Sequence, residues 1–542
     1  MSDSTSKDEV VDVLIAGAGP AGLALGGELG RAGVRALVLE REPEPPGFCR
    51  GFNLNARSLE LLDRRGLAAR FLAEGPTVPT TMFVGPSRLD LAAMRTKHPY
   101  VLGIPQTRVE ELLAEWAVGL GARLVRGRRL TRLRQDGDGV TVEVDGVDGP
   151  STVRCRWLVG CDGGRSTVRK TAGIGFPGTP ARKFTLLGDV VLTDPSAVSF
   201  GPNSGPGGRS VFAIPRPGYV RLATADPEPP ADPHEPVPLD SFQRAIDAAL
   251  GHRAEIAEAL WLTRFGDAAR LAEQFRTGRV LLAGDAAHIH PPAGAIGVNA
   301  AIDDAVNLGW KLALVARGQA PDTLLDTYHD ERHAAGERLL RNTRAQAVLA
   351  QANGDDDRLA PVRDLLAELA ESGDTAGPLA EAITAVGTRY PASGDPRHPW
   401  AGRMVPDISL GQDGEDTLAA LLTRSAGGAL LVNGATGSHA LSTAARPWAD
   451  RVTTAHTHPH ALERAHAILV RPDGHAAWIG APSTPVDTAA EQLRETLARW
   501  FGRPATPVDG APRTGSISGF ASVPPANRTA SRTLGANWRM QV

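Results

Sequence analysis

The chain has 542 residues, which is too long for one compact core, so we expect two or three domains. Its formal net charge of −3 excludes the strong basic field that nucleic acids or anionic membranes attract. No apolar stretch approaches the ~20 residues of a membrane helix, and residues 1–8 lack the apolar core of a signal peptide. Three cysteines are too few for a disulfide scaffold, so the composition predicts a soluble, cytoplasmic protein.

The first 40 residues combine β-type and helical patterns. Residues 11–16 and 34–39 are short apolar runs typical of buried strands, and residues 21–32 between them suit a helix. This order predicts a parallel sheet with a right-handed crossover. Further along, the pattern favours helices over residues 56–65 and 110–119, strands with a hairpin over 123–144, and a short strand over 157–161.

The sequence changes character after about residue 176. Proline and glycine become dense, and the runs at 184–192 and 210–214 look like strands, so we interpret this part as a separate sheet inserted into the first domain. The parallel-sheet pattern then returns with a strand at 280–283 and helices at 299–317 and 321–352.

The rest of the chain predicts a linker, a small α/β domain and a tail. Residues 354–400 are helical in part and rich in Asp, Pro and Gly, which indicates a linker. Residues 510–542 show little periodicity, and we expect them to be poorly ordered. The predicted domains are 1–175 and 276–353 for the first domain and its return, 176–275 for the inserted sheet, 354–400 for the linker, 401–509 for the C-terminal domain and 510–542 for the tail.

A G-x-G-x-x-G turn, Gly17 to Gly22, follows the first strand and opens a helix. Its glycines permit a tight turn, the approach of a pyrophosphate and close helix–sheet contact, and the positive end of the helix faces the phosphates. Glu40 ends the second strand at the distance where an acid holds ribose hydroxyls and repels a 2′-phosphate. The motif therefore predicts FAD or NAD, and not NADP, as the resident dinucleotide.

Two later strands also end in an acid beside glycine, at Asp162 and at Asp285. An acid in this position suits the ribityl hydroxyls of a flavin, which favours FAD over NAD. The alternative for Asp285 is a helix-capping or turn aspartate. A helix beginning at Gly297-Val298-Asn299 offers backbone N–H groups that can stabilise negative charge on the pyrimidine edge of a reduced flavin.

These three blocks, residues 17–22 with Glu40, 160–169 and 279–312, resemble the single-component FAD-dependent aromatic hydroxylases, whose prototype is the para-hydroxybenzoate hydroxylase fold. The length and the small C-terminal domain look like the members that tailor aromatic polyketides or act on rifampicin. The resemblance implies an α/β fold with a Rossmann-type FAD-binding domain, an inserted β-sheet substrate domain and a C-terminal thioredoxin-like domain. The chain departs from the family at Ala295-Ile296, where many relatives have Gly-Gln, and at Ala300-Ala301, where they have Thr-Gly. These positions flank the flavin and the substrate cavity, so the departures affect the expected substrate and reaction subtype and not FAD binding.

The resemblance also assigns residues to the cofactor. Arg50 would lie near the flavin and help with FAD or NADPH contacts, and the carbonyl of Pro292 would lie close to the reactive carbon of the flavin. The other implied cofactor residues are Gly17, Gly19, Pro20 and Gly22 for the pyrophosphate, Glu40 for the adenosine ribose, Arg41 for the adenine, Gln106 for the ribityl region, Asp285 for the ribityl region or the pyrophosphate, Asp162 for FAD and NADPH, and Gly297, Val298 and Asn299 for the pyrimidine ring.

The sequence has no second nucleotide fingerprint, and in this family NADPH binds transiently against the flavin. The resemblance implies that reduced FAD reacts with O2 to a C4a-hydroperoxide, which hydroxylates a polycyclic aromatic substrate in a cavity that excludes water. Three alternatives stay open. They are Baeyer–Villiger oxygen insertion by the same fold, a flavin dehydrogenase or oxidase, and a non-catalytic flavin-binding relative.

The remaining expectations concern the substrate, metals and partners. Phe212, Trp261 and Phe265 are candidates for the wall of the substrate cavity, with core packing as the alternative. His288 and His290 lack the companions of a metal site, so no metal is expected. The C-terminal domain contains no cysteine, which excludes a thiol redox role and favours packing or dimer contacts. We expect a monomer or homodimer without nucleic-acid or membrane partners.

Overall fold

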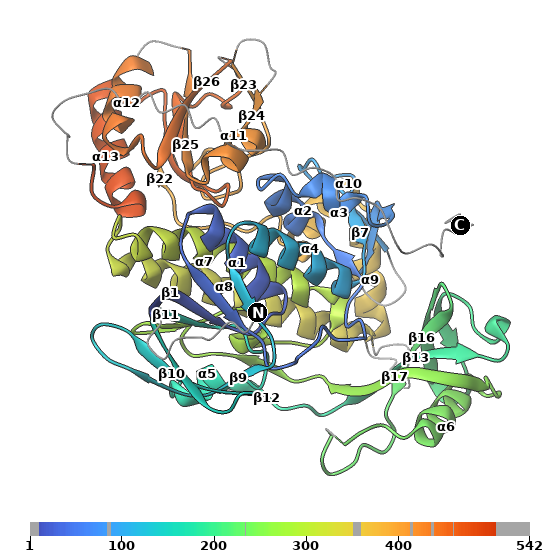
Figure 1. Ribbon diagram of the computed structural model, residues 1–542. Helices are drawn as coiled ribbons and strands as arrows, with labels where there is room; N and C mark the ends of the chain where they lie inside the picture. The colour runs from blue at the N-terminus through green and yellow to red at the C-terminus, as the bar shows by residue number, and fades with distance from the viewer. Residues whose placement is uncertain are drawn as a thin grey trace, which may run out of the picture. The chain divides into compact units, whose positions relative to one another are not determined.

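The computed structural model describes residues 10–83, 88–233, 235–350, 359–411, 416–434, 438–458 and 460–505 (Figure 1). The tail predicted at residues 510–542 lies outside these ranges.

The described chain begins with the predicted strand–turn–helix–strand unit. Strand β1 (Val10–Ala16) is apolar and largely buried, and β2 (Ala36–Leu39) is buried at every residue. Helix α1 (Pro20–Arg31) starts at a proline, whose fixed φ suits the first helical position. The two strands are parallel, with Val13 paired to Ala36, which confirms the predicted crossover.

The largest sheet has a parallel core with an antiparallel extension. The hairpin of β9 (Arg128–Gln135) and β10 (Val140–Gly146) extends the sheet from β11, and the edge strand β19 is antiparallel to β20. Because β20, β11 and β1 are parallel, the segments that follow them meet at one edge of the sheet. From this edge strand inward, the spatial order is β19 (Arg276–Thr277), β20 (Val280–Leu282), β11 (Ser151–Gly160), β1, β2 and β8 (Arg123–Val125).

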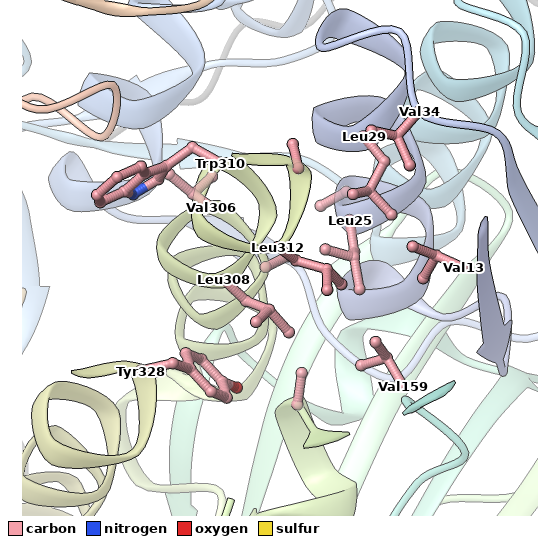
Figure 2. Close-up of a cluster of buried hydrophobic side chains, with 14 of the residues drawn as sticks. Val13, Leu25, Leu29, Val34, Val159, Val306, Leu308, Trp310, Leu312 and Tyr328 are labelled. Carbon is pink, nitrogen blue, oxygen red and sulfur yellow. The ribbon is translucent and has the colours of Figure 1, made fainter. Parts of the chain in front are cut away.

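Helices α4 (Gln106–Gly119) and α7 (Gly297–Ala316) pack against α1. The contact with α4 is close because Gly27 has no side chain, and a Cβ there would lie 2.1 Å from the Trp116 ring. Figure 2 shows the apolar contact with α7, where Leu25 of α1 faces Leu308 and Leu312. Helix α8 (Asp326–Ala350) follows and packs against α7.

The inserted segment forms a separate antiparallel sheet with a core of its own. Helix α6 (Leu239–Leu250) covers one face, where Gly188 leaves room for the ring of Phe242 at 2.6 Å from its Cβ position. The predicted separate sheet is therefore present, whereas α6 and the strand after it were not anticipated. In spatial order its strands are β14 (Gly201–Ser204), β15 (Ser210–Arg216), β16 (Tyr219–Ala225), β13 (Phe184–Leu192) and β17 (Ile256–Gly266).

The segment 354–400, predicted to be a linker, contains packed structure in its described part. Helices α9 (Ala360–Glu371) and α10 (Gly373–Ile383) form here. Composition suggested a free connection because the partner surface of these helices lies far away in the sequence. That apolar cluster joins Ala370, Ala380 and Ile383 to Ala56, Phe83, Leu89, Leu91 and Met94.

The C-terminal region contains a five-stranded mixed sheet (Figure 1). Strands β25 and β26 are parallel, and β27 runs antiparallel to its neighbours β25 and β28. The spatial order is β22 (Ser393–Gly394), β28 (Ala476–Gly480), β27 (Ala467–Val470), β25 (Gly428–Asn433) and β26 (Val452–Thr457), accompanied by helices α11 (Leu418–Ser425), α12 (Ser438–Ala445) and α13 (Val486–Phe501).

Short elements complete the part that positions the site. They are β3 (Asn53–Leu54), β4 (Thr77–Val78), β7 (Val101–Gly103), α2 (Ala56–Asp63), α3 (Ala68–Leu72) and α5 (Thr167–Thr171).

Candidate cofactor and substrate site

Three glycines shape the turn after β1, each for its own reason. Gly17 has a φ of +104°, and a Cβ there would lie 2.3 Å from the carbonyl oxygen of Cys161. A Cβ on Gly22 would lie 2.0 Å from the carbonyl oxygen of Gly17, whereas the Cβ position of Gly19 has no atom within 4 Å. Gly17 and Gly22 therefore permit the turn itself, and Gly19 keeps open the space in front of α1, where a pyrophosphate would bind.

Glu40 lies beside this turn, as its spacing suggested. Its carboxylate accepts hydrogen bonds from the backbone N–H of Ala18 at 2.8 Å and of Glu42 at 3.0 Å. Arg41 is exposed, and its guanidinium pairs with Glu42 at 3.0 Å. The ribose contact of Glu40 and the adenine contact of Arg41 stay predictions.

Asp285 stands exposed at the edge where the parallel strands end. Among the described residues its carboxylate has no hydrogen bond or ion-pair partner. Gly284 before it has a φ of +61°, and its N–H donates to the Asp304 carboxylate at 2.9 Å. The aspartate is thus held at the surface by its neighbour, with its own oxygens available to a ligand.

The segment after Asp285 leads into the predicted pyrimidine-binding helix. Pro292 is exposed, and α7 begins at Gly297 without a side-chain cap. The first N–H groups of a helix have no partner within the helix, and its dipole places positive charge there. The geometry of this helix start therefore suits an anionic ring edge.

The side chain of Asn299 has a structural role that the sequence did not indicate. It is buried, and its Oδ1 accepts hydrogen bonds from the N–H of Asn55 at 2.8 Å and the hydroxyl of Ser58 at 2.7 Å. This oxygen connects α7 to the start of α2. The flavin contact predicted for the backbone of Asn299 stays a prediction.

Asp162 differs from Asp285 although both follow a parallel strand. Its carboxylate accepts hydrogen bonds from the N–H groups of Thr167 at 2.7 Å and Val168 at 3.1 Å, so it caps α5 together with the N-cap residue Ser166. Arg169 of that helix donates to the carbonyl of Ala286 at 2.8 Å, which joins the second sequence block to the third. The capping role was not anticipated, and the FAD and NADPH contact of Asp162 stays a prediction.

The loop that carries Arg50 is held against the start of α4. The N–H of Gln106 donates to the carbonyl of Gly51 at 2.8 Å, and its side-chain amide donates to Glu110 at 2.8 Å. Arg50 itself is exposed, with its guanidinium 5.6 Å from the centre of the Phe48 ring. The fold thus brings the two predicted flavin-side residues together.

Glu110 is a charged residue of this region that sequence reasoning missed. Burial raises the pKa of its carboxyl group, and the Gln106 hydrogen bond and the charges of Arg50 and Arg126 oppose the rise. Glu40 adds to the rise, so the two acids lie within electrostatic reach of each other. The only signal in the sequence was the i, i+4 spacing from Gln106.

The face of the inserted sheet opposite α6 carries the predicted cavity-wall residues. Phe212 pairs with Ala223, and Phe265 pairs with Thr185, so alternation places all four on this face. Trp261 shares it but stacks on Phe48, with ring centres 4.5 Å and planes 6° apart. The face is half-buried and mostly apolar, and its members include Thr185, Leu187, Phe212, Ile214, Ala223, Thr263 and Phe265.

Two arginines on this face differ in their partners. Arg221 is buried and donates through Nε and Nη2 to Asp189, both at 2.7 Å, and Nη2 also donates to the carbonyl of Cys49. The Arg216 guanidinium lies 3.9 Å from the centre of the Phe52 ring, and its buried Nε has no hydrogen-bond partner among the described residues. Burial lowers the pKa of Arg216. One cation is thus neutralised, and the other has no ion-pair partner among the residues that the structure describes.

This arrangement defines a dinucleotide-binding flavoprotein: a glycine turn and a helix start at one sheet edge, with an apolar second sheet connected to the Arg50 loop. Comparison with known proteins gives the family. Residues 10–343 match the family model of the FAD binding domain, and residues 398–504 match the aromatic-ring hydroxylase C-terminal model. The chain belongs to the FAD-dependent aromatic-ring hydroxylases, and it is a FAD-dependent monooxygenase.

Relatives with related chemistry match over nearly their whole length. A 12-dehydrotetracycline 5-monooxygenase/anhydrotetracycline 6-monooxygenase of Streptomyces rimosus is 43% identical over 500 residues, which cover 89% of this chain and 98% of that protein. A rifampicin monooxygenase of Streptomyces venezuelae is 43% identical over 493 residues, 86% of this chain and 95% of that protein. The solved anhydrotetracycline hydroxylase of Streptomyces rimosus has 42% identity and a TM-score of 0.83, covering 92% of this chain and all of that one.

One relative carries a different kind of name. The dialkyldecalin synthase of Streptomyces rugosporus is 36% identical over 486 residues, 88% of this chain and 98% of that protein. The fold therefore serves relatives whose names describe ring formation as well as oxygenation.

The described residues show neither a membrane helix nor a metal cluster. Within them, every helix is too short or too polar to cross a membrane. They also contain no group of three His, Cys, Asp or Glu side chains arranged as metal ligands. His288 Nε2 instead contacts Asp304 at 2.8 Å, and His290 Nδ1 donates to the carbonyl of Pro291 at 2.8 Å.

Proposed function

We propose that the chain is an NADPH-dependent FAD monooxygenase that hydroxylates a polycyclic aromatic, polyketide-type substrate in secondary-metabolite biosynthesis or drug modification. The observation that carries this proposal is the apolar, half-buried face of the inserted sheet, which connects through Trp261 and Phe48 to the loop of Arg50. A flat surface of phenylalanine and aliphatic side chains suits a fused-ring ligand. The tetracycline and rifampicin names of relatives support the same substrate class.

The residues fit FAD in the way that the resemblance implies. The open space at Gly19 leaves room for the pyrophosphate, and the exposed carboxylate of Asp285 can accept hydrogen bonds from ribityl hydroxyls. When bound, FAD accepts a hydride from NADPH and transfers one oxygen atom of O2 to the substrate. The helix start at Gly297 and Val298 would stabilise the anionic ring edge, Pro292 would present its carbonyl beside the flavin, and Arg50 would assist NADPH.

Arg216 adds a proposal about the ionisation of the substrate. An aromatic ring is hydroxylated more readily as a phenolate, because the negative charge makes the ring more nucleophilic. A partly buried guanidinium without a counter-ion favours such an anion beside the apolar face. We therefore assign Arg216 to an acidic phenol or enol oxygen of the substrate.

The first test is anaerobic stopped-flow reduction of the purified protein by NADPH, with and without a tetracyclic polyphenol. We expect the polyphenol to accelerate flavin reduction many-fold. Equally slow reduction in both cases would argue against this substrate class. In a second experiment under 18O2, the product should carry the label, and label from water alone would contradict oxygenation.

Arg50 has its own test. We expect Arg50→Ala to retain FAD and to slow flavin reduction or hydroxylation strongly, because the residue is exposed in the loop next to the predicted flavin contacts. Unchanged turnover would remove Arg50 from the site. Arg134→Ala, at an exposed arginine of β9 without an assigned site role, serves as a charge-matched control.

A second candidate is catalysis or binding without net oxygenation, which similarity to the dialkyldecalin synthase favours. Failure of NADPH to reduce the flavin with any substrate would support it. Baeyer–Villiger insertion into a ketone is the remaining oxygenation outcome. It would give an ester or lactone in place of a phenol, which mass spectrometry with product NMR distinguishes.

The architecture proposed for this function has three parts. They are a Rossmann-type FAD-binding domain, an inserted substrate sheet and a thioredoxin-like C-terminal domain. The strand order β26-β25-β27-β28 followed by α13 supports the last assignment. The assembly is proposed to be a monomer or homodimer, and light scattering would decide between them.

A further inference from the structure

The hairpin turn between β27 and β28 carries a buried ionic cluster. The turn closes with hydrogen bonds from the N–H of Arg471 to the carbonyl of His475 at 2.8 Å and from Gly474 to Arg471 at 2.9 Å. Arg471, Asp473 and His475 are each at most 1% exposed. Their partners belong to α2, α7 and α8, so this C-terminal turn contacts the helices around the FAD-binding loop.

The charges of the cluster balance one another. Arg471 pairs with Asp473 and with Glu331, and Glu331 accepts a hydrogen bond from Lys311 at 2.8 Å. A buried cluster of this kind keeps its geometry because moving one member leaves another charge unpaired. The cations are Arg57, Lys311, Arg332 and Arg471, and the anions are Asp303, Asp304, Glu331 and Asp473, each with a side chain at most 5% exposed.

His475 is the member of the turn that contacts α2. Its Nδ1 lies 2.8 Å from the carbonyl of Gly402, which can only accept, so Nδ1 carries the proton. Nε2 is then an acceptor, and it receives the Nη2 hydrogen of Arg57 at 2.9 Å. The imidazole ring also packs on Tyr390, with ring centres 4.3 Å apart.

From Arg57, one chain of hydrogen bonds leads to the loop before Asp285. Arg57 donates to Asp303 at 2.8 Å, and Arg332 donates to Asp303 at 2.6 Å and to Asp304 at 2.7 Å. The second oxygen of Asp304 accepts the N–H of Gly284 at 2.9 Å. Gly284 is the left-handed residue that directs Asp285 outward.

A second connection leads from Arg57 to the start of α7. Arg57 lies in the first turn of α2, between Asn55 and Ser58. Both of those residues donate to Asn299 Oδ1, at the helix start assigned to the flavin ring. The two connections from Arg57 therefore reach the two segments predicted to contact the flavin, the Gly284–Asp285 loop and the start of α7.

We propose that His475 is a positioning residue for FAD: through Arg57 it holds the Gly284–Asp285 loop and the start of α7 in the geometry that binds the flavin. This gives the cysteine-free C-terminal region a role in the cofactor site. The proposal rests on FAD binding. Its test measures FAD affinity without NADPH, O2 or substrate. The proposal about His475 can therefore fail while the proposed hydroxylation holds, and the hydroxylation can fail while the proposal about His475 holds.

The experiment compares two substitutions of His475 in the full chain. His475→Leu keeps much of the volume and removes the acceptor, whereas His475→Gln keeps an acceptor for Arg57. We measure the FAD dissociation constant of the apoprotein by flavin fluorescence and the flavin midpoint potential by dye-coupled reduction. We expect His475→Leu to weaken FAD binding at least tenfold and to shift the potential, and His475→Gln to stay within about threefold of wild type.

A second buried histidine of the C-terminal region provides the matched control. His398 is 6% exposed, and its Nε2 bonds to the carbonyl of Leu462 at 3.1 Å, apart from the ionic cluster. His398→Leu should lower thermal stability and leave FAD affinity and midpoint potential unchanged. Equal loss of FAD affinity in the two leucine variants would overturn the proposal, because the effect would then be general destabilisation.

Tyr390→Phe tests the same path if His475→Leu does not fold. The Tyr390 hydroxyl accepts a hydrogen bond from Arg332 at 2.9 Å, and its removal preserves the shape of the ring. We expect about threefold weaker FAD binding with little change in stability. Unaltered affinity in every folded variant of His475 and Tyr390 contradicts the proposal.

Discussion

The chain holds two charged regions that differ in how their charges are satisfied. Around α2, α7, α8 and the turn at Arg471, every cation of the buried cluster faces an anion of the same chain. In the predicted ligand site the charges are less satisfied. Asp285 at the sheet edge and Arg50 in its loop are exposed, and Arg216 of the inserted sheet has a buried nitrogen without a partner among the described residues.

The difference separates residues that hold the fold from residues that await a ligand. A buried charge paired within the chain contributes to one geometry, and its loss leaves a partner uncompensated. A polar group that the chain leaves unpaired can form its contact with a ligand, and removing it affects binding more than folding. Matched substitutions on the two sides can test this division.

The largest expected effect is on FAD binding at Gly19. Because nothing lies within 4 Å of its Cβ position, Gly19→Val should fold normally and fill the space of the pyrophosphate. We expect FAD affinity to fall by at least about 1,000-fold, roughly 4 kcal/mol, in a fluorescence titration. Gly137→Val, at another open position, is the control and should bind FAD as wild type does.

The next contrast is between Arg221 and Arg216. Arg221→Met leaves Asp189 buried and unpaired, so the free energy of unfolding should fall by about 3 kcal/mol. Arg216→Met should leave stability nearly unchanged and weaken binding of an ionised polyphenol by about 10–100-fold. Urea unfolding and ligand titration measure the two effects. Loss of stability in both variants, with intact ligand affinity, would assign Arg216 to the fold.

A pH effect on stability should arise from His475. Burial, together with the charges of Arg57 and Arg471, lowers the pKa of its imidazole from 6.5 to about 3, and Asp473 opposes this shift. The unfolded chain therefore binds a proton that the folded chain does not, so this stabilisation is full above pH 6.5 and declines as the pH falls toward 3. At pH 5 the loss is about 2 kcal/mol.

Urea unfolding at pH 7.5 and pH 5.0 measures this loss, with His475→Gln as the comparison. The glutamine variant should lose about 2 kcal/mol less between the two pH values, since it has no imidazole to protonate. Equal pH dependence in the two proteins would mean that the folded state accepts the proton on His475.

The smallest effects should come from the two strand-end aspartates. Asp162→Ala removes the acceptor for the first two N–H groups of α5, leaves the N-cap Ser166, and should lower stability by about 1 kcal/mol. Asp285→Ala should leave stability unchanged and weaken FAD binding by about tenfold, because it loses a charge-assisted contact. If both variants lose stability equally, Asp285 is a turn aspartate, as the alternative had it.

Sequence patterns succeeded where the cause of structure is local. The βαβ unit, the returning strand β20 and strand β13 follow from runs of apolar residues, and the structure has them close to the predicted bounds. They failed where the partner is distant. The segment of α9 and α10 was predicted to be a partly helical linker. Its packing was missed because the apolar partners, from Ala56 to Met94, lie far away in the sequence.

The site divides in the same way. Gly17, Glu40 and Asp285 could be predicted as cofactor residues from their positions at strand ends, since the binding of a dinucleotide requires those residue types at that spacing. The spacing could not distinguish the exposed Asp285 from the capping Asp162. It also gave no sign that Asn299 would turn its oxygen to α2.

The class of protein could be inferred from the sequence, because a glycine turn, an acid and two later blocks indicate a FAD site. Each of these motifs is a short stretch of neighbouring residues, so its residue types and spacing can be recognised without the tertiary structure. Which charged side chains pair with each other inside the protein became clear only from the tertiary structure. Arg57 reaches His475 across 418 positions of the chain, and Arg221 reaches Cys49 across 172. Such pairs depend on how strands and helices are stacked, which no local pattern of residues records, and they separate the charges that stabilise the fold from those left for a ligand.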